Sequence, residues 1–196
     1  MVDRAGHDLD QRIAARVRDL RARHRFTLDA LAERSGVSRS MISLIERGES
    51  SPTAVLLERL ATALNVPLAS LFDAPGPNHE PVVRRADQIE WRDPASGYVR
   101  RNVSPGNFAS PIQIVEIEFP PKARVAFDNG GRDVRAHQQV WVLEGSIEVS
   151  VGDDCHRLGK GDCLAFVLDR PTAFHNRTRR PAQYAVVIVS EAGIGA

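Results

Sequence analysis

The stretch TLDALAERSGVSRSMISLIE, residues 27–46, decides the fold of the N-terminal part of the chain. Ala32 leaves room for two helices to cross closely, and Gly36 can adopt the left-handed backbone conformation that a tight interhelical turn requires. Ile42 and Ile45 then supply apolar contacts that seat the second helix. This spacing predicts a helix, a tight turn and a second helix packed on a common core.

Helical periodicity continues on both sides of this stretch, from Ile13 to Leu64. Thr27 is expected to cap the helix that follows it. Ser51-Pro52 is expected to open a later helix, because the missing N–H of proline is no loss in a first turn. A further short helix is predicted for LASLF at residues 68–72. We therefore expect a five-helix bundle over residues 8–72.

The composition changes at DAPGPNHEP, residues 73–81, which begins a predicted linker over residues 73–88. Beyond it, alternating and β-branched runs predict strands. The clearest are IQIVEIEF (112–119), VWVL (140–143), SIEVSV (146–151) and AVVIV (185–189). Short strands separated by glycine and aspartate turns predict a closed barrel or a sandwich over residues 89–193, and of these we expect a barrel of the jelly-roll type. The expected fold class is an α domain followed by a β domain.

Residues 10–72, including IERGESSPT at 45–53, resemble the Cro/cI-type helix-turn-helix family, also called the xenobiotic-response-element family. In that family the second helix of the motif lies in the major groove of DNA. Mapped onto this chain, the resemblance implies base contacts from Arg39, Ser40, Ser43 and Leu44, and phosphate contacts from Thr27, Ser38 and Arg47. Arg39 is the strongest candidate, because a guanidinium can pair with both O6 and N7 of guanine.

Two features of this segment leave alternatives open. Family members often carry glutamine at the start of the first motif helix, where this chain has Thr27 or Leu28. The stretch from Arg12 to Arg25 holds six arginines and a single acid, Asp19. A basic face suits phosphate binding, but it is also what a solvated helix face looks like. A helical bundle that binds protein instead of DNA is the alternative.

Residues 140–176 resemble the cupin barrel in VLEG (142–145), GKGD (159–162) and the segment from Pro171 to Asn176. Many cupins bind a metal through histidines and a glutamate. Counting from Gly145 and Pro171 puts those ligand positions at Arg132, Val134, Gln138 and Thr172, none of which is a good metal ligand.

His137 and His175 lie close to these positions but should point to the opposite face of their strands. We therefore expect no metal and no cofactor. The barrel interior would instead hold a small molecule, lined by Arg132, Gln138 and Thr172. Further arginines are candidate anion partners, although simple solvation is favoured for most of them: Arg100, Arg101, Arg124 and Arg135.

Together the two resemblances imply a sequence-specific transcription regulator, not an enzyme. It would bind a double-stranded DNA operator as a homodimer and respond to a small-molecule effector held in the β domain. The alternatives are a metal-dependent cupin enzyme of the iron oxygenase or epoxidase type with an accessory helix-turn-helix domain, and a pure interaction module.

Bulk properties restrict the remaining possibilities. The N-terminus MVDRAGHDLD lacks the apolar stretch of a secretory signal, and no apolar run is long enough to span a membrane, so a cytoplasmic protein is expected. The net charge of +1 does not indicate a partner. Cys155 and Cys163, the only cysteines, are expected to be free and half-buried on strands.

Overall fold

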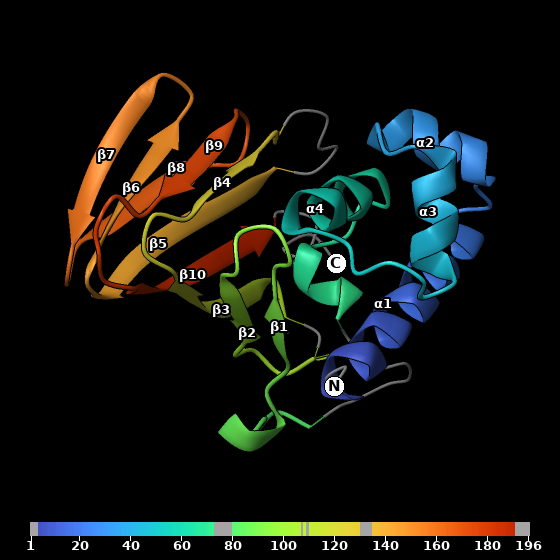
Figure 1. Ribbon diagram of the computed structural model, residues 1–196, viewed down its shortest axis with the longest axis horizontal. Helices are drawn as coiled ribbons and strands as arrows, with labels where there is room; N and C mark the ends of the chain where they lie inside the picture. The colour runs from blue at the N-terminus through green and yellow to red at the C-terminus, as the bar shows by residue number, and fades with distance from the viewer. Residues whose placement is uncertain (1–3, 73–79, 107, 109, 130–134, 191–196) are drawn as a thin grey trace. The chain divides into compact units, whose positions relative to one another are not determined.

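The computed structural model describes residues 4–72, 80–106, 108, 110–129 and 135–190 of the chain. The chain divides into two compact units, Met1–Asn78 and His79–Ala196 (Figure 1). This division falls within the predicted linker, of which residues 73–79 lie outside the described residues and Arg85–Asp87 forms a single 3-10 turn, η2. No helix among the described residues is long and apolar enough to cross a membrane.

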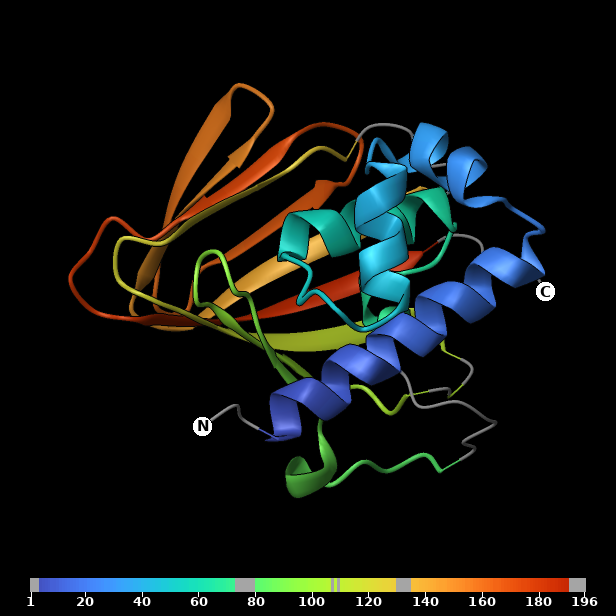
Figure 2. The same cartoon turned by 45° about the vertical axis from the view of Figure 1, so that its right-hand side comes forward.

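The first unit is helical. Its elements are α1 (Arg4–Arg23), α2 (Leu28–Ser35), α3 (Arg39–Glu46), α4 (Ala54–Ala63) and the 3-10 helix η1 (Leu68–Leu71). α3 packs against both α1 and α2, and α4 packs against α2 and η1 (Figure 2). The core consists of fully buried aliphatic side chains from all four α-helices, among them Ile13, Val17, Leu31, Ile42, Ile45, Leu57 and Leu60.

The turn between α2 and α3 has the predicted conformation. Gly36 has φ 65° and ψ 15°, and its N–H donates to the carbonyl of Ala32 at 2.9 Å. Oγ1 of Thr27 caps α2 by accepting from the N–H of Ala30 at 3.1 Å. Ser38 caps α3 in the same way, through the N–H of Met41 at 3.2 Å. Two short helices are thereby started by side-chain caps and joined by one left-handed residue.

Two details of the helical prediction are wrong. The described part of the unit has four α-helices rather than five, because the segment after Pro67 makes 3-10 bonds, such as Ser70 N–H to the Pro67 carbonyl at 2.9 Å. Four residues are too few for a stable α-helix. α4 begins at Ala54 instead of at the Ser51-Pro52 pair, because Oγ1 of Thr53 is the side chain that caps it.

The second unit is built from antiparallel strands. They are β1 (Glu90–Arg92), β2 (Val99–Asn102), β3 (Ile112–Phe119), β4 (Arg124–Phe127), β5 (Ala136–Glu144), β6 (Ser146–Val151), β7 (Asp154–Gly159), β8 (Cys163–Val167), β9 (Thr172–His175) and β10 (Ala182–Ser190). A six-stranded sheet has the order β1-β2-β3-β10-β5-β8, and a four-stranded sheet has the order β4-β9-β6-β7. Among the described residues the strands form these two sheets rather than the closed barrel that we expected, with β7 and β8 as open edges.

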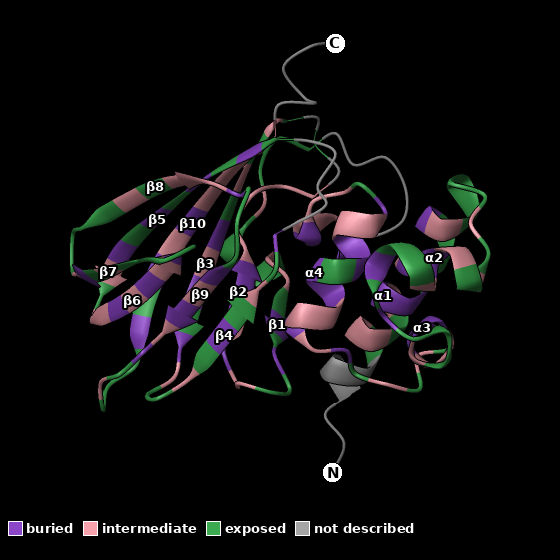
Figure 3. Ribbon diagram, turned by 90° about the horizontal axis from the view of Figure 1, so that it is seen from above, coloured by how far each residue is buried: buried purple, intermediate pink, exposed green. Residues whose placement is uncertain are grey.

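Alternating side chains create the core between the two sheets. Along β5 the even-numbered residues from Ala136 to Val142 are buried, and the residues between them are exposed or half-buried, an alternation visible as bands in Figure 3. A run of aromatic contacts crosses this interior. Phe174 of β9 stacks on Tyr184 of β10 with ring centroids 5.8 Å apart, and Tyr184 contacts Phe119. Tyr98 continues the run from Phe119 to Trp91.

Asn176 joins elements of both sheets at the end of β9. It is fully buried, and its Nδ2 donates to the carbonyl of Phe119 at 3.2 Å and to that of Arg180 at 2.8 Å. Its backbone N–H donates to the carbonyl of Ala123, and its Oδ1 accepts from the N–H of Thr178 at 2.9 Å. Every polar group of this side chain is thus used within the fold.

Candidate functional site

The solvent side of α3 carries the predicted base-reading residues. Ile42, Ile45 and Glu46 are buried, whereas Arg39 and Ser40 in the first turn are exposed. Ser43 is half-buried and lies one turn from Arg39, on the same face of the helix. Leu44 is half-buried and one turn from Ser40. One face of the helix is therefore buried in the core. The other face is open to solvent and carries the hydrogen-bonding side chains expected of a base-reading helix.

Arg39 is held by a residue that the sequence did not indicate. Its Nε lies 3.1 Å from Oδ1 of Asp29 in the first turn of α2, and both side chains are largely exposed. An exposed pair of this kind contributes little to stability. Its consequence is geometric: the recorded contact is made by Nε, and the two terminal nitrogens of the fork are the remaining donors. Those are the two donors that an end-on contact with guanine O6 and N7 requires.

Arg47 and Ser43 form a second group at the far end of α3. Nη1 of Arg47 donates to Oγ of Ser43 at 2.5 Å, and its Nη2 donates to Oε2 of Glu49 at 2.7 Å. This contact with Glu49 raises the pKa of Arg47 and lowers that of Glu49. Because the oxygen of Ser43 accepts from Arg47, its own hydrogen is available for an acceptor such as guanine O6 or thymine O4.

The predicted phosphate-contacting residues Thr27 and Ser38 are both N-caps. Their side-chain oxygens accept from backbone N–H groups of their helices, and Oγ of Ser38 also lies 3.2 Å from Oγ of Ser40. Both residues are exposed. A hydroxyl that accepts from a helix N–H still has a hydrogen to donate, and the helix N-terminus beneath it favours an anion.

α3 is fixed to α1 by a partly buried ion pair. Nε and Nη2 of Arg21 donate to the two carboxylate oxygens of Glu46 at 2.6 and 2.8 Å, and Nη1 donates to the carbonyl of Phe26 at 2.9 Å. This bonding raises the pKa of Arg21. Arg18 donates to the backbone carbonyl of Glu46. The end of the exposed helix therefore has a defined position relative to the core.

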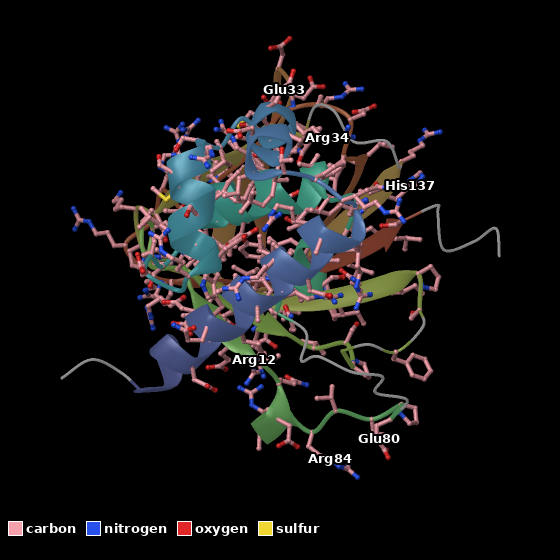
Figure 4. The ribbon with its side chains drawn as sticks, turned by 90° about the vertical axis from the view of Figure 1, so that its right-hand side faces the viewer. Arg12, Glu33, Arg34, Glu80, Arg84 and His137 are labelled. Carbon is pink, nitrogen blue, oxygen red and sulfur yellow. The ribbon has the colours of Figure 1, made fainter. Side chains whose placement is uncertain are left out.

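Three further arginines of α1 also have partners within the unit. Arg16 donates to the carbonyl of Ser70 at 3.0 Å, Arg12 lies 3.5 Å from Asp8, and Arg23 lies 2.9 Å from Asp19. These contacts favour the structural interpretation of the basic stretch over phosphate binding. On α2, by contrast, Glu33 and Arg34 are exposed (Figure 4), and the guanidinium of Arg34 lies 4.9 Å from the Phe26 ring centroid.

In the β unit, the predicted effector residues Gln138 and Thr172 are both buried on the inner faces of their sheets, one in each sheet. Nδ2 of Asn129 donates to Oγ1 of Thr172 at 3.0 Å. Gln113 of β3 is in register with Ile188, which is in register with Gln138, so both glutamines face inward on the same row. Arg132, the third predicted residue, lies outside the described residues.

Gln113 was missed by the sequence analysis. Its side-chain oxygen is buried and has no hydrogen-bond partner among the described residues. Asn129 was missed as well. Neither residue belongs to a motif: strand pairing places Gln113 on the same row as Gln138, and the fold brings Asn129 to Thr172. A signal was available in IQIVEIEF, where glutamine occupies an inward position of an otherwise apolar alternation.

The histidines have the predicted strand parity. His137 is exposed beside buried Gln138, and His175 follows buried Phe174. The described residues contain no group of three or more histidine, cysteine, aspartate or glutamate side chains that could hold a metal ion.

The four candidate anion-binding arginines differ in exposure. Arg124 and Arg135 are exposed, whereas Arg101 is buried beside Glu116 and Glu90. Arg100 is buried as well, and burial lowers its pKa while Tyr98 and Tyr184 act in the opposite direction. These four arginines therefore do not form one cluster on the inner face: two lie in solvent, and Arg101 faces acids of the neighbouring strands.

Comparison with known proteins identifies the first unit. Residues 17–71 match the helix-turn-helix family HTH_3. These residues form a helix-turn-helix domain. The chain is 41% identical over 63 residues to the HTH-type transcriptional regulator SutR of Escherichia coli (strain K12), an alignment that covers 32% of this chain and 35% of SutR.

Two further similarities extend beyond the helix-turn-helix domain. The HTH-type transcriptional regulator PuuR of Escherichia coli (strain K12) is 26% identical over 164 residues, covering 82% of this chain and 85% of PuuR. The crystal structure of an HTH_3 family transcriptional regulator from Vibrio cholerae has a TM-score of 0.77 at 24% identity, covering 94% of this chain and 98% of that chain. The likeness in fold to the Vibrio cholerae protein thus extends over residues of both units.

The sequence similarity is uneven along the relatives. The chain spans 35% of the length of SutR and 49% of that of SlrR, a Bacillus subtilis (strain 168) regulator. The alignments over 63 and 77 residues are 41% and 36% identical, whereas the alignment over 164 residues is 26% identical.

Proposed function

We propose that the protein is a sequence-specific transcription regulator that reads double-stranded DNA with α3. The observation that carries this proposal is that α3 has two different faces: Ile42 and Ile45 are buried in the core, while on the other face Arg39 and Ser40 are exposed and Ser43 is half-buried. The similarity of residues 17–71 to the HTH_3 family supports the same conclusion. Direct readout in the major groove requires exposed hydrogen-bond donors on a helix whose position is fixed by its packing.

Selection of bound fragments from genomic DNA by the purified protein tests this proposal. The wild type should enrich one sequence motif, and Arg39→Ala should lose guanine preference at one position at a cost of about 1–3 kcal/mol. Arg47→Ala, at a predicted phosphate contact, is the comparison: it should weaken all sequences about equally and reduce the salt slope by about one unit, with any change of preference confined to the base that Ser43 contacts. An unchanged motif with Arg39→Ala would remove Arg39 from base reading, and binding without any motif would overturn the function.

The regulator is proposed to respond to a small polar molecule held between the two sheets. Gln138 and Thr172 are buried on facing sheets, and the side-chain oxygen of Gln113 is buried with no partner among the described residues. Unsatisfied buried polar groups are costly, so a donor supplied by a ligand would stabilise this end of the interior. A ligand changes DNA affinity only if it binds two conformations differently.

A thermal-shift screen tests the effector proposal. A panel of amino acids, dicarboxylates and sugars would be added to the wild type and to Gln138→Leu and Gln113→Leu variants. A compound that stabilises the wild type, loses most of its effect in both variants and alters DNA affinity supports the proposal. Ser150→Ala, on a strand of the four-stranded sheet, is the control. Stabilisation that is equal in all variants would place the compound elsewhere.

The protein is further proposed to act as a cytoplasmic homodimer without enzymatic activity. One helix-turn-helix domain contacts only a short half-site, and two copies related by a two-fold axis read a two-fold operator. Metal analysis tests the non-enzymatic part. Iron or zinc retained at one ion per chain after dialysis against a chelator would instead favour a metal-dependent cupin enzyme.

A further inference from the structure

The outer face of the six-stranded sheet carries apolar side chains on four adjacent strands, exposed on β3, β5 and β8 and half-buried on β10, with His137 and Gln139 among them. The strand register brings together residues of β3, β10, β5 and β8, namely Ile112, Ile114, Val187, Trp141, Ala165 and Cys163. Ile112 is 46% exposed, Ile114 38% and Trp141 51%. Single exposed apolar residues are ordinary on a protein surface, but a contiguous group marks an interaction site.

The central strand of this face, β10, is apolar on both sides. Tyr184, Val186 and Ile188 alternate with residues that point outward, which are Ala185, Val187 and Val189. An antiparallel strand with one solvated face alternates apolar and polar residues, whereas a strand covered on both faces is continuously apolar. The run AVVIV therefore fits a strand whose outer face is also covered.

The charge and size of the face favour a second copy of the chain as the occupant. The outward positions of the described strands β3, β10, β5 and β8 include no lysine or arginine, and Glu116 and Glu118 lie at the β3 border. A face with little charge at its centre does not repel its own copy. Four strands and three rows of side chains give a footprint of roughly 400 Å². That is comparable with the apolar core of an interface that buries about 800 Å² on each partner.

From these observations we infer that the outer face of the six-stranded sheet, centred on Trp141, is the surface through which two copies of this chain form a two-fold dimer. The inference rests on the proposed dimeric reading of DNA and adds the surface that makes it. In an isologous interface the same residues serve both copies, and a central tryptophan is a typical anchor.

The two cysteines provide a direct test in the full-length protein. Cys163 is in register with Trp141 on this face, and Cys155 lies on β7 in the other sheet; both are exposed. The rate at which each thiol reacts with an aromatic disulfide reagent would be measured across protein concentrations, with Cys155→Ser and Cys163→Ser variants to assign the signals. Cys163 should react about ten-fold more slowly as the dimer forms, and Cys155 should not change.

Substitution of Trp141 gives an independent measurement. Trp141→Glu places like charges across the two-fold axis and should raise the dimer dissociation constant by about 100-fold or more, whereas Trp141→Phe should change it only by about three-fold to ten-fold. Trp91 is then the remaining tryptophan; it is buried, and its fluorescence reports whether each variant is folded.

The outcomes separate the surface from the function. A dimer that persists in folded Trp141→Glu, or in which Cys163 stays as reactive as in dilute solution, overturns this surface but leaves DNA reading intact. Protection of Cys163 in a monomer shows that the chain's own helical unit covers the face and also overturns it. A chain that stays monomeric on its DNA motif overturns both this inference and the proposed dimer.

Discussion

The guanidinium of Arg21 binds both carboxylate oxygens of Glu46 and so connects α1 to the last turn of α3. Glu46 is 6% exposed, and its backbone carbonyl accepts from Arg18. The position of the face of α3 that is proposed to read bases therefore depends on a contact made on the opposite side of the same helix.

We expect Glu46→Ala to destabilise the protein by about 2–4 kcal/mol, because it leaves the partly buried Arg21 without its carboxylate. Urea unfolding followed by circular dichroism measures this loss. The double variant Arg21→Met with Glu46→Leu should recover most of it, since a well-packed apolar pair of similar size can replace a buried ion pair. Equal stability of wild type and Glu46→Ala would contradict a structural role for the pair.

Asp29 is expected to sharpen the specificity of Arg39. Removing its charge with Asp29→Ala should increase binding to non-specific DNA, because one repulsion of phosphate is lost, while the preference for guanine falls by about three-fold to ten-fold. Competition binding with matched and mismatched duplexes measures both effects.

Glu33→Ala is the control for this change, since Glu33 is exposed on the same helix and is found in no ion pair among the described residues. It should raise non-specific binding without altering the preference for guanine. If the two variants behave alike, Asp29 acts only through its charge and does not orient Arg39.

The two tyrosines should remain silent in an alkaline titration until the β unit unfolds. Tyr98 and Tyr184 are the only tyrosines, and burial raises the pKa of both, against the opposing effect of Arg100. Because each folded-state pKa lies above the unfolded value of about 10, stability is unaffected below that pH and is lost as the pH rises above it.

Absorbance of tyrosinate and circular dichroism, recorded together, check this expectation. Tyrosinate should appear only in step with loss of structure, and Tyr184→Phe should move the transition to higher pH. Ionisation of either tyrosine in the fully folded protein would mean that solvent reaches the aromatic interior.

Gly36 should tolerate side chains according to their backbone preference, because a Cβ at this position would meet no atom within 4 Å. The only cost in folding free energy is then that of holding a residue with a side chain at a positive φ. Gly36→Ala should cost about 1–2 kcal/mol, and Gly36→Asn clearly less, since asparagine adopts this conformation more readily. Thermal unfolding ranks the three proteins, and equal loss in both variants would indicate a steric cause instead.

The helical unit was predictable because its signals are local. Periodic apolar residues, the caps Thr27 and Ser38, and the turn at Gly36 all act within a few residues. The start of α4 was misassigned because Ser51 and Thr53 are both good caps, and the choice depends on a distant residue: Ser51 binds Asp10 of α1.

The β unit was predicted less completely, because much of its pairing is non-local. β2 was missed since it contains the adjacent residues Arg100 and Arg101, which suggest a loop. In the fold they are buried on opposite faces, where Arg101 pairs with Glu116 of the neighbouring strand. Cys155 and Cys163 were expected to be half-buried but are exposed, because β7 and β8 are edge strands.

The candidate sites show the same division. The register of the helix-turn-helix motif located Arg39, Ser40 and Ser43 on α3. The partner Asp29 of Arg39 depends on how α2 and α3 meet, which no spacing along the chain encodes, whereas Glu49 lies only two residues from its partner Arg47. Likewise Gln138 followed from a motif, whereas Gln113 reaches the same inner row only through the pairing of β3 with β10.

Asn176 has a consequence for how the β unit comes apart. Its side-chain amide donates to carbonyls at the end of β3 and just before β10. Its backbone N–H donates to the carbonyl of Ala123, just before β4. Neither sheet can separate from the other without leaving buried carbonyls unbonded. The two sheets are therefore expected to exchange their amide hydrogens through a common opening and to melt as one cooperative unit, although the strands themselves form two distinct layers.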